Sequence, residues 1–146
     1  YLKVNFASNG FPFLRNGNVV ALYGNLGSGK TCFTQGLAKA LKVKEKILSP
    51  TFVILKIYQG HFQNTKSSKI NRLKQLKIYH FDCYRIKKTE EILDLGFKDI
   101  LNEKDRIIVI EWADRIKKIL PKKRIDIWFK FGIKENERKM TLTINN

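Results

Sequence analysis

The order of apolar and polar positions divides the chain into short segments with the periodicity of strands or helices. Apolar runs rich in β-branched and aromatic residues predict strands, and apolar residues three and four positions apart predict helices. We expect strands over 18–24, 52–58, 78–82 and 107–110, helices over 30–43, 87–97 and 112–120, and a terminal hairpin of strands 124–131 and 138–144. Strands and helices alternate early and strands accumulate late, which predicts a layered α/β fold with a mixed, partly antiparallel sheet.

One polar segment, residues 59–77, interrupts this pattern. It contains five basic residues and no acidic residue. We interpret it as a basic insertion or loop between two strands of a single domain that covers residues 1–146. A solvated loop is the simpler interpretation of such a charge run, and a phosphate-binding patch is the alternative.

The charge of the whole chain gives only modest information about its partners. The 29 basic and 13 acidic residues give a net charge of +16, which favours polyanionic partners. The chain is also rich in Lys, Ile and Asn, a mixture that an AT-rich genome produces by codon usage alone. Two cysteines are too few for a disulfide scaffold or a zinc cluster. No apolar run approaches the ~20 residues that span a bilayer, and no leader sequence is evident, so we expect a soluble, cytoplasmic protein.

The stretch "GNLGSGKT" carries the strongest chemical signal. It matches the phosphate-binding pattern G-x-x-x-x-G-K-[ST] at Gly24, Gly29, Lys30 and Thr31. The glycines, Gly27 included, allow backbone conformations in which the amide groups surround an anion, and the following helix adds its positive end. The lysine would reach the β- and γ-phosphates and the threonine hydroxyl would bind magnesium. We therefore predict a P-loop fold that binds a nucleotide together with Mg²⁺.

A phosphate loop of this kind needs a carboxylate at the end of a neighbouring strand. Asp82 ends the segment "IYHFD" and Glu111 ends "IIVIE". An acid at a strand end most often faces solvent, but ligands of open α/β sheets bind at the carboxyl ends of the strands, where both acids would lie. Thr51, in "SPTF", is a further candidate, because a hydroxyl after the first helix can sense the γ-phosphate. His80 is interpreted as structural.

Taken together, five motifs in order resemble one known family. They are "GNLGSGKT", "SPTF", "HFDCYRI", "ILDLGF" and "VIEWADRI" followed by "LP". The set is similar to the TsaE (formerly YjeE) family of small bacterial P-loop ATPases, over about residues 18–146. The resemblance implies a three-layer fold with a C-terminal hairpin. It also implies a weak, magnesium-dependent ATPase that is required for threonylcarbamoyladenosine modification of tRNA. Such an ATPase acts on a TsaD–TsaB complex to reset it between turnovers.

The resemblance also implies roles for single residues. Residues 27–32, which include Ser28 and Cys32, would hold the phosphates, and Thr31 and Glu111 would hold magnesium. Hydrolysis would require Lys30, Asp82 and Glu111, and Thr51 would lie in a switch-like segment. Trp112 would sit beside the nucleotide or at the partner surface, and Arg138 would lie near the nucleotide.

The sequence departs from the family pattern in several places. Asn25 and Ser28 stand where Asp and Ala are usual, the segment 59–77 is long, and no helix is evident before the first strand. Two other functions stay open. A small-molecule P-loop kinase would need a lid with several arginines, and the seven arginines of this chain are scattered. A tRNA-contacting module that holds ATP passively would fit the positive charge.

Overall fold

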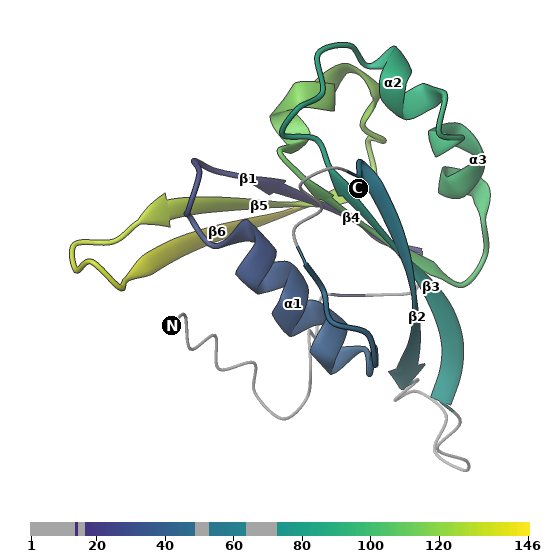
Figure 1. Ribbon diagram of the computed structural model, residues 1–146, viewed down its shortest axis with the longest axis horizontal. Helices are drawn as coiled ribbons and strands as arrows, with labels where there is room; N and C mark the ends of the chain where they lie inside the picture. The colour runs from purple at the N-terminus through teal and green to yellow at the C-terminus, as the bar shows by residue number, and fades with distance from the viewer. Residues whose placement is uncertain (1–13, 15–16, 49–52, 64–72) are drawn as a thin grey trace.

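The computed structural model describes residue 14 and residues 17–48, 53–63 and 73–146. In this part of the chain six strands form one sheet in the order β2-β3-β4-β1-β5-β6 (Figure 1). The strands are β1 (Val19–Tyr23), β2 (Leu55–Gln63), β3 (Leu73–Asp82), β4 (Arg106–Glu111), β5 (Arg124–Phe131) and β6 (Arg138–Asn145). The helices are α1 (Lys30–Ala40), α2 (Glu90–Leu93), α3 (Phe97–Asn102) and the 3₁₀ segment η1 (Ala113–Ile119). None of these helices has the length and apolar character that crossing a bilayer requires.

The middle of the sheet is parallel and its two edges are antiparallel. β1 pairs in parallel with β4 on one side and with β5 on the other, and β3 pairs in parallel with β4. β2 and β6 are the edge strands, and each runs antiparallel to its neighbour. The carboxyl ends of β1, β3 and β4 therefore meet at one edge of the sheet, as the predicted mixed α/β fold requires.

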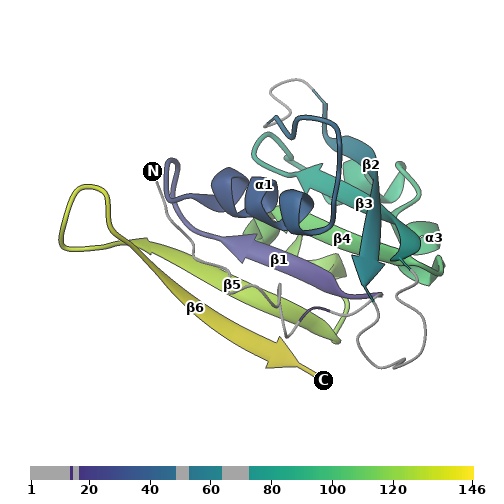
Figure 2. The same ribbon diagram turned by 90° about the horizontal axis from the view of Figure 1, so that it is seen from below.

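Both faces of the sheet are covered, which produces three layers. All five residues of β1 are buried, and they alternate between two apolar cores. Val20 and Leu22 pack in the core that α1 covers, whereas Val19, Ala21 and Tyr23 pack in the core on the opposite face. Figure 1 shows α1 on one side of the sheet and α2 and α3 on the other, and Figure 2 shows α1 and α3 from a second direction.

Helix α1 follows the phosphate motif directly and packs through one stripe. It begins at Lys30, after Gly29 in the left-handed conformation with φ 105°. Its buried residues follow the three- and four-residue spacing of an amphipathic helix; they are Lys30, Phe33, Thr34, Leu37 and Ala38. Burial of Phe33 and Leu37 stabilises this contact by roughly 1.5–3 kcal/mol for each side chain.

The loop predicted over residues 59–77 is wrong at both of its ends. Residues 59–63 belong to β2 and 73–77 belong to β3, and the two strands pair with Gln59 opposite Lys77. Polar residues are compatible with these strands because the exposed positions, Gln59 and Lys77 among them, face solvent. Lys77 also donates to Glu103 Oε2 at 3.2 Å. The strand expected over 52–58 begins at Leu55, and Phe52 lies outside the described residues.

Two predicted helices are shorter and more broken than expected. The segment 87–97 forms α2 and is followed, after Gly96 at φ 78°, by α3, which the sequence pattern did not indicate. The segment 112–120 is not an α-helix but two 3₁₀ turns that meet at Ile116, where φ is −121°. Trp112 precedes them in the left-handed conformation, with φ 58° and ψ 45°.

The C-terminal hairpin matches the prediction to within one residue, since β6 ends at Asn145, and a polar network ties it to β1. Tyr23 donates to Asp126 Oδ1 at 2.9 Å, and Arg124 Nε donates to the same oxygen at 2.8 Å. Asn145 donates to Asp126 Oδ2 at 2.8 Å. The Tyr23 ring also stacks on Trp128, with ring centroids 4.1 Å apart. This network holds β5 and β6 beside the strand that leads into the phosphate motif.

Candidate active site

The loop that follows β1 has the backbone of an anion-binding turn. Gly24, Gly27 and Gly29 have φ values of 143°, 73° and 105°, which side-chain-bearing residues rarely adopt. Gly24 is also enclosed, because a Cβ there would lie 2.7 Å from the Phe129 carbonyl oxygen and 2.8 Å from Ser28 Oγ. The sequence motif is therefore required by both the conformation and the packing of this loop.

The loop contains a buried polar group without a partner. Ser28 is fully buried, and its Oγ makes no hydrogen bond to any described residue. A buried hydroxyl is normally paired, so an unpaired one marks a place where a ligand group fits. The N-terminus of the eleven-residue helix α1 lies next to it and favours negative charge. Together with the three glycines, these features fit a phosphate group.

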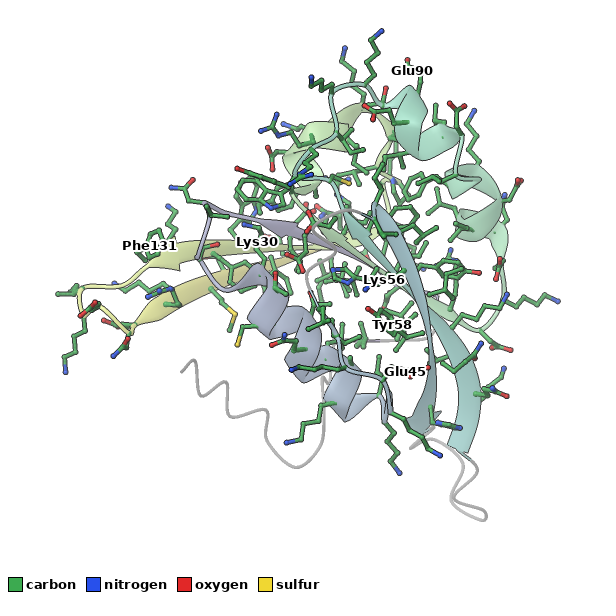
Figure 3. The ribbon with its side chains drawn as sticks, viewed as in Figure 1. Lys30, Glu45, Lys56, Tyr58, Glu90 and Phe131 are labelled. Atoms are coloured by element: carbon green, nitrogen blue, oxygen red, sulfur yellow. The ribbon has the colours of Figure 1, made fainter. Side chains whose placement is uncertain are left out.

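Lys30 is held against the loop by two hydrogen bonds. Its Nζ donates to the carbonyl oxygen of Gly24 at 2.6 Å and to that of Asn25 at 2.9 Å. The ammonium also lies 3.7 Å from the centroid of the Trp112 ring. Burial lowers the pKa of Lys30, and the negative charges of Glu111 and Asp82 oppose that shift. Figure 3 shows Lys30 between the start of α1 and the sheet.

The phosphate loop and the end of β4 meet through one hydrogen bond. Thr31 Oγ1 donates to Glu111 Oε2 at 2.8 Å, although 80 positions separate the two residues. Glu111 is buried, with 1% of its surface exposed. Hydroxyl and carboxylate oxygens are the ligands that Mg²⁺ prefers, and in P-loop proteins the ion is bound by one or two such groups together with the phosphates. This pair therefore fits a magnesium ion. The described residues contain no cluster of three or more His, Cys, Asp or Glu side chains suited to a metal.

Asp82 lies beside Glu111. The two acids are register partners at the ends of β3 and β4, so their side chains leave the sheet on the same face. Asp82 is half-buried, and its Oδ1 accepts a hydrogen bond from the Tyr84 amide at 3.0 Å. Both acids line one pocket, as expected from the sequence.

That pocket has a volume of about 510 Å³ and joins the phosphate loop to the ends of β3 and β4. The loop contributes residues 26–32, including the exposed Cys32. The other lining residues are Val53, Ile54, Asp82, Tyr84, Arg85, Glu111 and Trp112. The Tyr84 and Trp112 rings contact each other with centroids 4.9 Å apart. A cavity of this size accommodates part of a nucleotide.

Arg138 reaches the phosphate loop from the C-terminal hairpin, at the margin of this arrangement. Its Nη2 lies 3.5 Å from the Gly27 carbonyl oxygen, and its guanidinium group lies over the Phe131 ring at 4.7 Å. It does not line the pocket itself. Thr51, the remaining predicted site residue, lies outside the described residues.

Two residues at the site were not recognised in the sequence. Thr34 Oγ1 lies 3.2 Å from Glu111 Oε1, and His80 Nε2 lies 2.9 Å from the same oxygen. Their positions follow simple periodicities. Thr34 is three positions after Thr31 on one helix face, and His80 is two positions before Asp82 on one strand face. The alternation of His80 with Tyr79 and Phe81 indicates a structural residue, and this pattern does not show that its face of the strand meets Glu111.

Comparison with known proteins agrees with the resemblance seen in the motifs. A family model described as "Threonylcarbamoyl adenosine biosynthesis protein TsaE" matches residues 4–140. A tRNA threonylcarbamoyladenosine biosynthesis protein TsaE from Rickettsia prowazekii is 38% identical over 93% of this chain and 83% of its own length. A protein of the same name from Treponema pallidum is 37% identical over 78% of this chain and 73% of its own length.

A solved structure supports the same assignment. The crystal structure of Bacillus subtilis YdiB matches the fold with a TM-score of 0.65 and 29% sequence identity, over 92% of this chain and 72% of that chain. The predicted α/β fold with a mixed sheet is therefore confirmed. The matched residues, the fold and the phosphate-binding loop together show that this chain belongs to the TsaE family of proteins in tRNA threonylcarbamoyladenosine biosynthesis.

Proposed function

We propose that this chain binds ATP with Mg²⁺ and hydrolyses it in the service of a TsaD–TsaB-type complex, which it resets between rounds of tRNA modification. The observation that carries the proposal is the 2.8 Å hydrogen bond between Thr31 and Glu111, because it joins a phosphate loop to a strand-end carboxylate. The membership of the chain in a tRNA threonylcarbamoyladenosine family supplies the pathway. Since that pathway acts on tRNA, we place the activity in the cytoplasm.

The residues of the pocket divide the work. The loop amides and Ser28 would hold the phosphates, and Lys30 would exchange its contacts with the Gly24 and Asn25 carbonyls for phosphate oxygens. Thr31 and Glu111 would hold magnesium, which neutralises charge on the phosphates when it is bound. Asp82 is the acid that remains at the pocket wall, and we assign it the orientation of the attacking water.

The isolated chain is expected to be a weak ATPase. Lys30 is satisfied by backbone carbonyls, and Thr31 and Glu111 are satisfied by each other. Binding of nucleotide and metal must replace these internal contacts, and their loss reduces the net free energy of binding. A partner that seats the nucleotide in the pocket would raise the rate without changing the residues involved.

The test is ATP hydrolysis by the purified chain with and without a purified TsaD–TsaB complex. We expect a low rate alone and a clearly higher rate with the complex. A Glu111→Gln variant serves as the matched control and should be inactive in both mixtures. Equal, near-zero rates for the unaltered chain in both mixtures would contradict the proposal.

Direct contact with tRNA is the second candidate, and one observation favours it. A groove next to α2 is lined by Lys87, Lys88, Thr89, Glu90, Asp114, Arg115, Lys117 and Lys118, so its basic residues outnumber its acidic ones. Phosphate contacts release counterions and make affinity fall with salt. If the isolated chain contacts tRNA here, its affinity should be tight at low salt and fall steeply as salt is raised. A flat salt dependence would exclude this role.

A further inference from the structure

Glu111 has different partners on its two carboxylate oxygens. Oε2 accepts from Thr31 at 2.8 Å, on the side of the phosphate loop. Oε1 faces the interior, where His80 Nε2 lies at 2.9 Å and Thr34 Oγ1 at 3.2 Å. His80 is fully buried. The Oε1 contacts are therefore made to buried protein groups, whereas Oε2 lies on the side of the pocket.

His80 is the principal donor to Oε1. A carboxylate accepts hydrogen bonds, so the geometry assigns a proton to His80 Nε2. His80 Nδ1 has no partner among the described residues, which suits a bare lone pair better than an N–H group. Thr34 has one hydroxyl proton but two acceptors, because the Lys30 carbonyl oxygen lies at 3.1 Å. The threonine therefore shares its proton, whereas the histidine does not.

We propose that His80 is a positioning residue that fixes the magnesium ligand Glu111. With Oε1 anchored by His80, the carboxylate cannot rotate and Oε2 stays directed at Thr31. Without the hydrogen bond from His80, the carboxylate could rotate so that either oxygen accepts from Thr31 or Thr34. Neither oxygen would then be held in a fixed position to bind the metal. Partners that orient a ligand in this way typically contribute 10–100-fold, as an order of magnitude, to metal affinity. The proposal rests on the magnesium–nucleotide site proposed above.

The experiment compares the affinity for ADP, by isothermal titration calorimetry, in EDTA and in excess Mg²⁺. The ratio of the two dissociation constants measures the metal contribution in each variant. His80→Leu removes the donor, and we expect it to reduce this ratio by roughly tenfold while the affinity in EDTA is unchanged. His80→Gln places an amide N–H near the former Nε2 position and should restore most of the ratio.

A double substitution separates positioning from general structural damage. If His80 acts through Glu111, His80→Leu should have no further effect on the metal-dependent ratio in a Glu111→Gln background. If His80 had only a structural role, His80→Leu would instead lower both the affinity in EDTA and the melting temperature. It would do so with and without Glu111→Gln. Thr34→Val keeps the side-chain shape and provides a second probe should His80→Leu fail to fold. It should reduce the ratio by less than His80→Leu, or, if only Thr34→Val folds, by less than tenfold.

Three outcomes would overturn the proposal: an unchanged ratio in His80→Leu, equal losses in His80→Leu and His80→Gln, or a loss of tenfold or more in Thr34→Val. The proposed ATPase function fails by a different result, namely the absence of partner-stimulated hydrolysis. Since the calorimetry requires neither hydrolysis nor the partner complex, the two failures are distinguishable.

Discussion

The ammonium of Lys30 lies 3.7 Å from the centroid of the Trp112 ring, so an aromatic face covers the lysine at the phosphate loop. A phosphate that draws Lys30 away from the Gly24 and Asn25 carbonyls must change the surroundings of that ring. We therefore expect Trp112 fluorescence to change when ADP binds. The measurement needs Trp128→Phe, because the chain contains two tryptophans.

The control for this prediction is Lys30→Met in the same single-tryptophan background, which should show no response to ADP. Unchanged Trp112 emission, under conditions where calorimetry shows that ADP is bound, would contradict the inferred movement of Lys30.

Lys30 and Glu111 should affect different parts of nucleotide binding. Lys30→Met removes a charged donor to the phosphates and should weaken ADP binding in EDTA by roughly 10–100-fold, since such bonds contribute about 1.5–3 kcal/mol. Glu111→Gln should leave the affinity in EDTA nearly unchanged but abolish hydrolysis. Calorimetry in EDTA and a phosphate-release assay measure the two effects. Normal turnover by Glu111→Gln would remove Glu111 from the proposed metal site.

The hydrogen bond from Tyr23 to Asp126 predicts a dependence of stability on alkaline pH. Burial, with a further contribution from the bond to Asp126, raises the pKa of Tyr23 from 10.0 to about 12. Because the folded pKa is the higher one, this contribution is complete below pH 10 and is lost as the pH rises towards about 12. Tyr23→Phe should cost about 1 kcal/mol at pH 8 and less at pH 11.

Urea unfolding at the two pH values measures this difference. Tyr58→Phe is the matched control, because the buried Tyr58 hydroxyl has no partner among the described residues and its loss should cost less at pH 8. A Tyr23→Phe cost that does not shrink between pH 8 and pH 11 would show that the Tyr23 hydroxyl is not the titrating group.

The two cysteines should differ in reactivity. Cys32 is exposed and lines the pocket, whereas Cys83 is buried, and burial raises the pKa of the Cys83 thiol to about 12. The thiolate is the reactive form, so iodoacetamide at pH 8 should modify Cys32 alone in the folded protein. ADP should slow that reaction. Mass spectrometry of the digested protein locates the label, and modification at Cys83 or a lack of protection by ADP would contradict the geometry.

Local signals in the sequence were sufficient to predict a mixed α/β sheet with the phosphate loop and Glu111 at strand ends. Gly24 and Lys30 belong to a motif whose spacing is set by the chemistry of the loop, and Glu111 ends an apolar run long enough to be a buried strand. The structure places these residues together because parallel strands end at the same edge. The family of the chain was also predictable, since its motifs occur in one order.

The parts that were missed depend on tertiary contacts. In the sequence His80 is one residue of a strand that mixes polar and apolar positions. Its contact with Glu111 depends on the pairing of β3 with β4 and on the position of α1, which the sequence does not give. Residues such as Gln59 and Lys77 are polar because β2 is an edge strand, and polarity alone cannot distinguish an edge strand from a loop. The backbone at Ile116 interrupts an apparently helical segment, and no proline or glycine at that position predicts the interruption.

The order of the strands implies that the central and the outer strands differ in how much sequence change they tolerate. The side chains that form the pocket walls at strand ends come from β3 and β4, which are bonded on both sides, whereas β2 and β6 each have one bonded neighbour. Neither outer strand is a bonded neighbour of β4, so a substitution in β2 or β6 can be accommodated without moving Glu111. Relatives of this protein are expected to diverge most along these outer strands, where lineage-specific partners can be acquired while the nucleotide pocket is conserved.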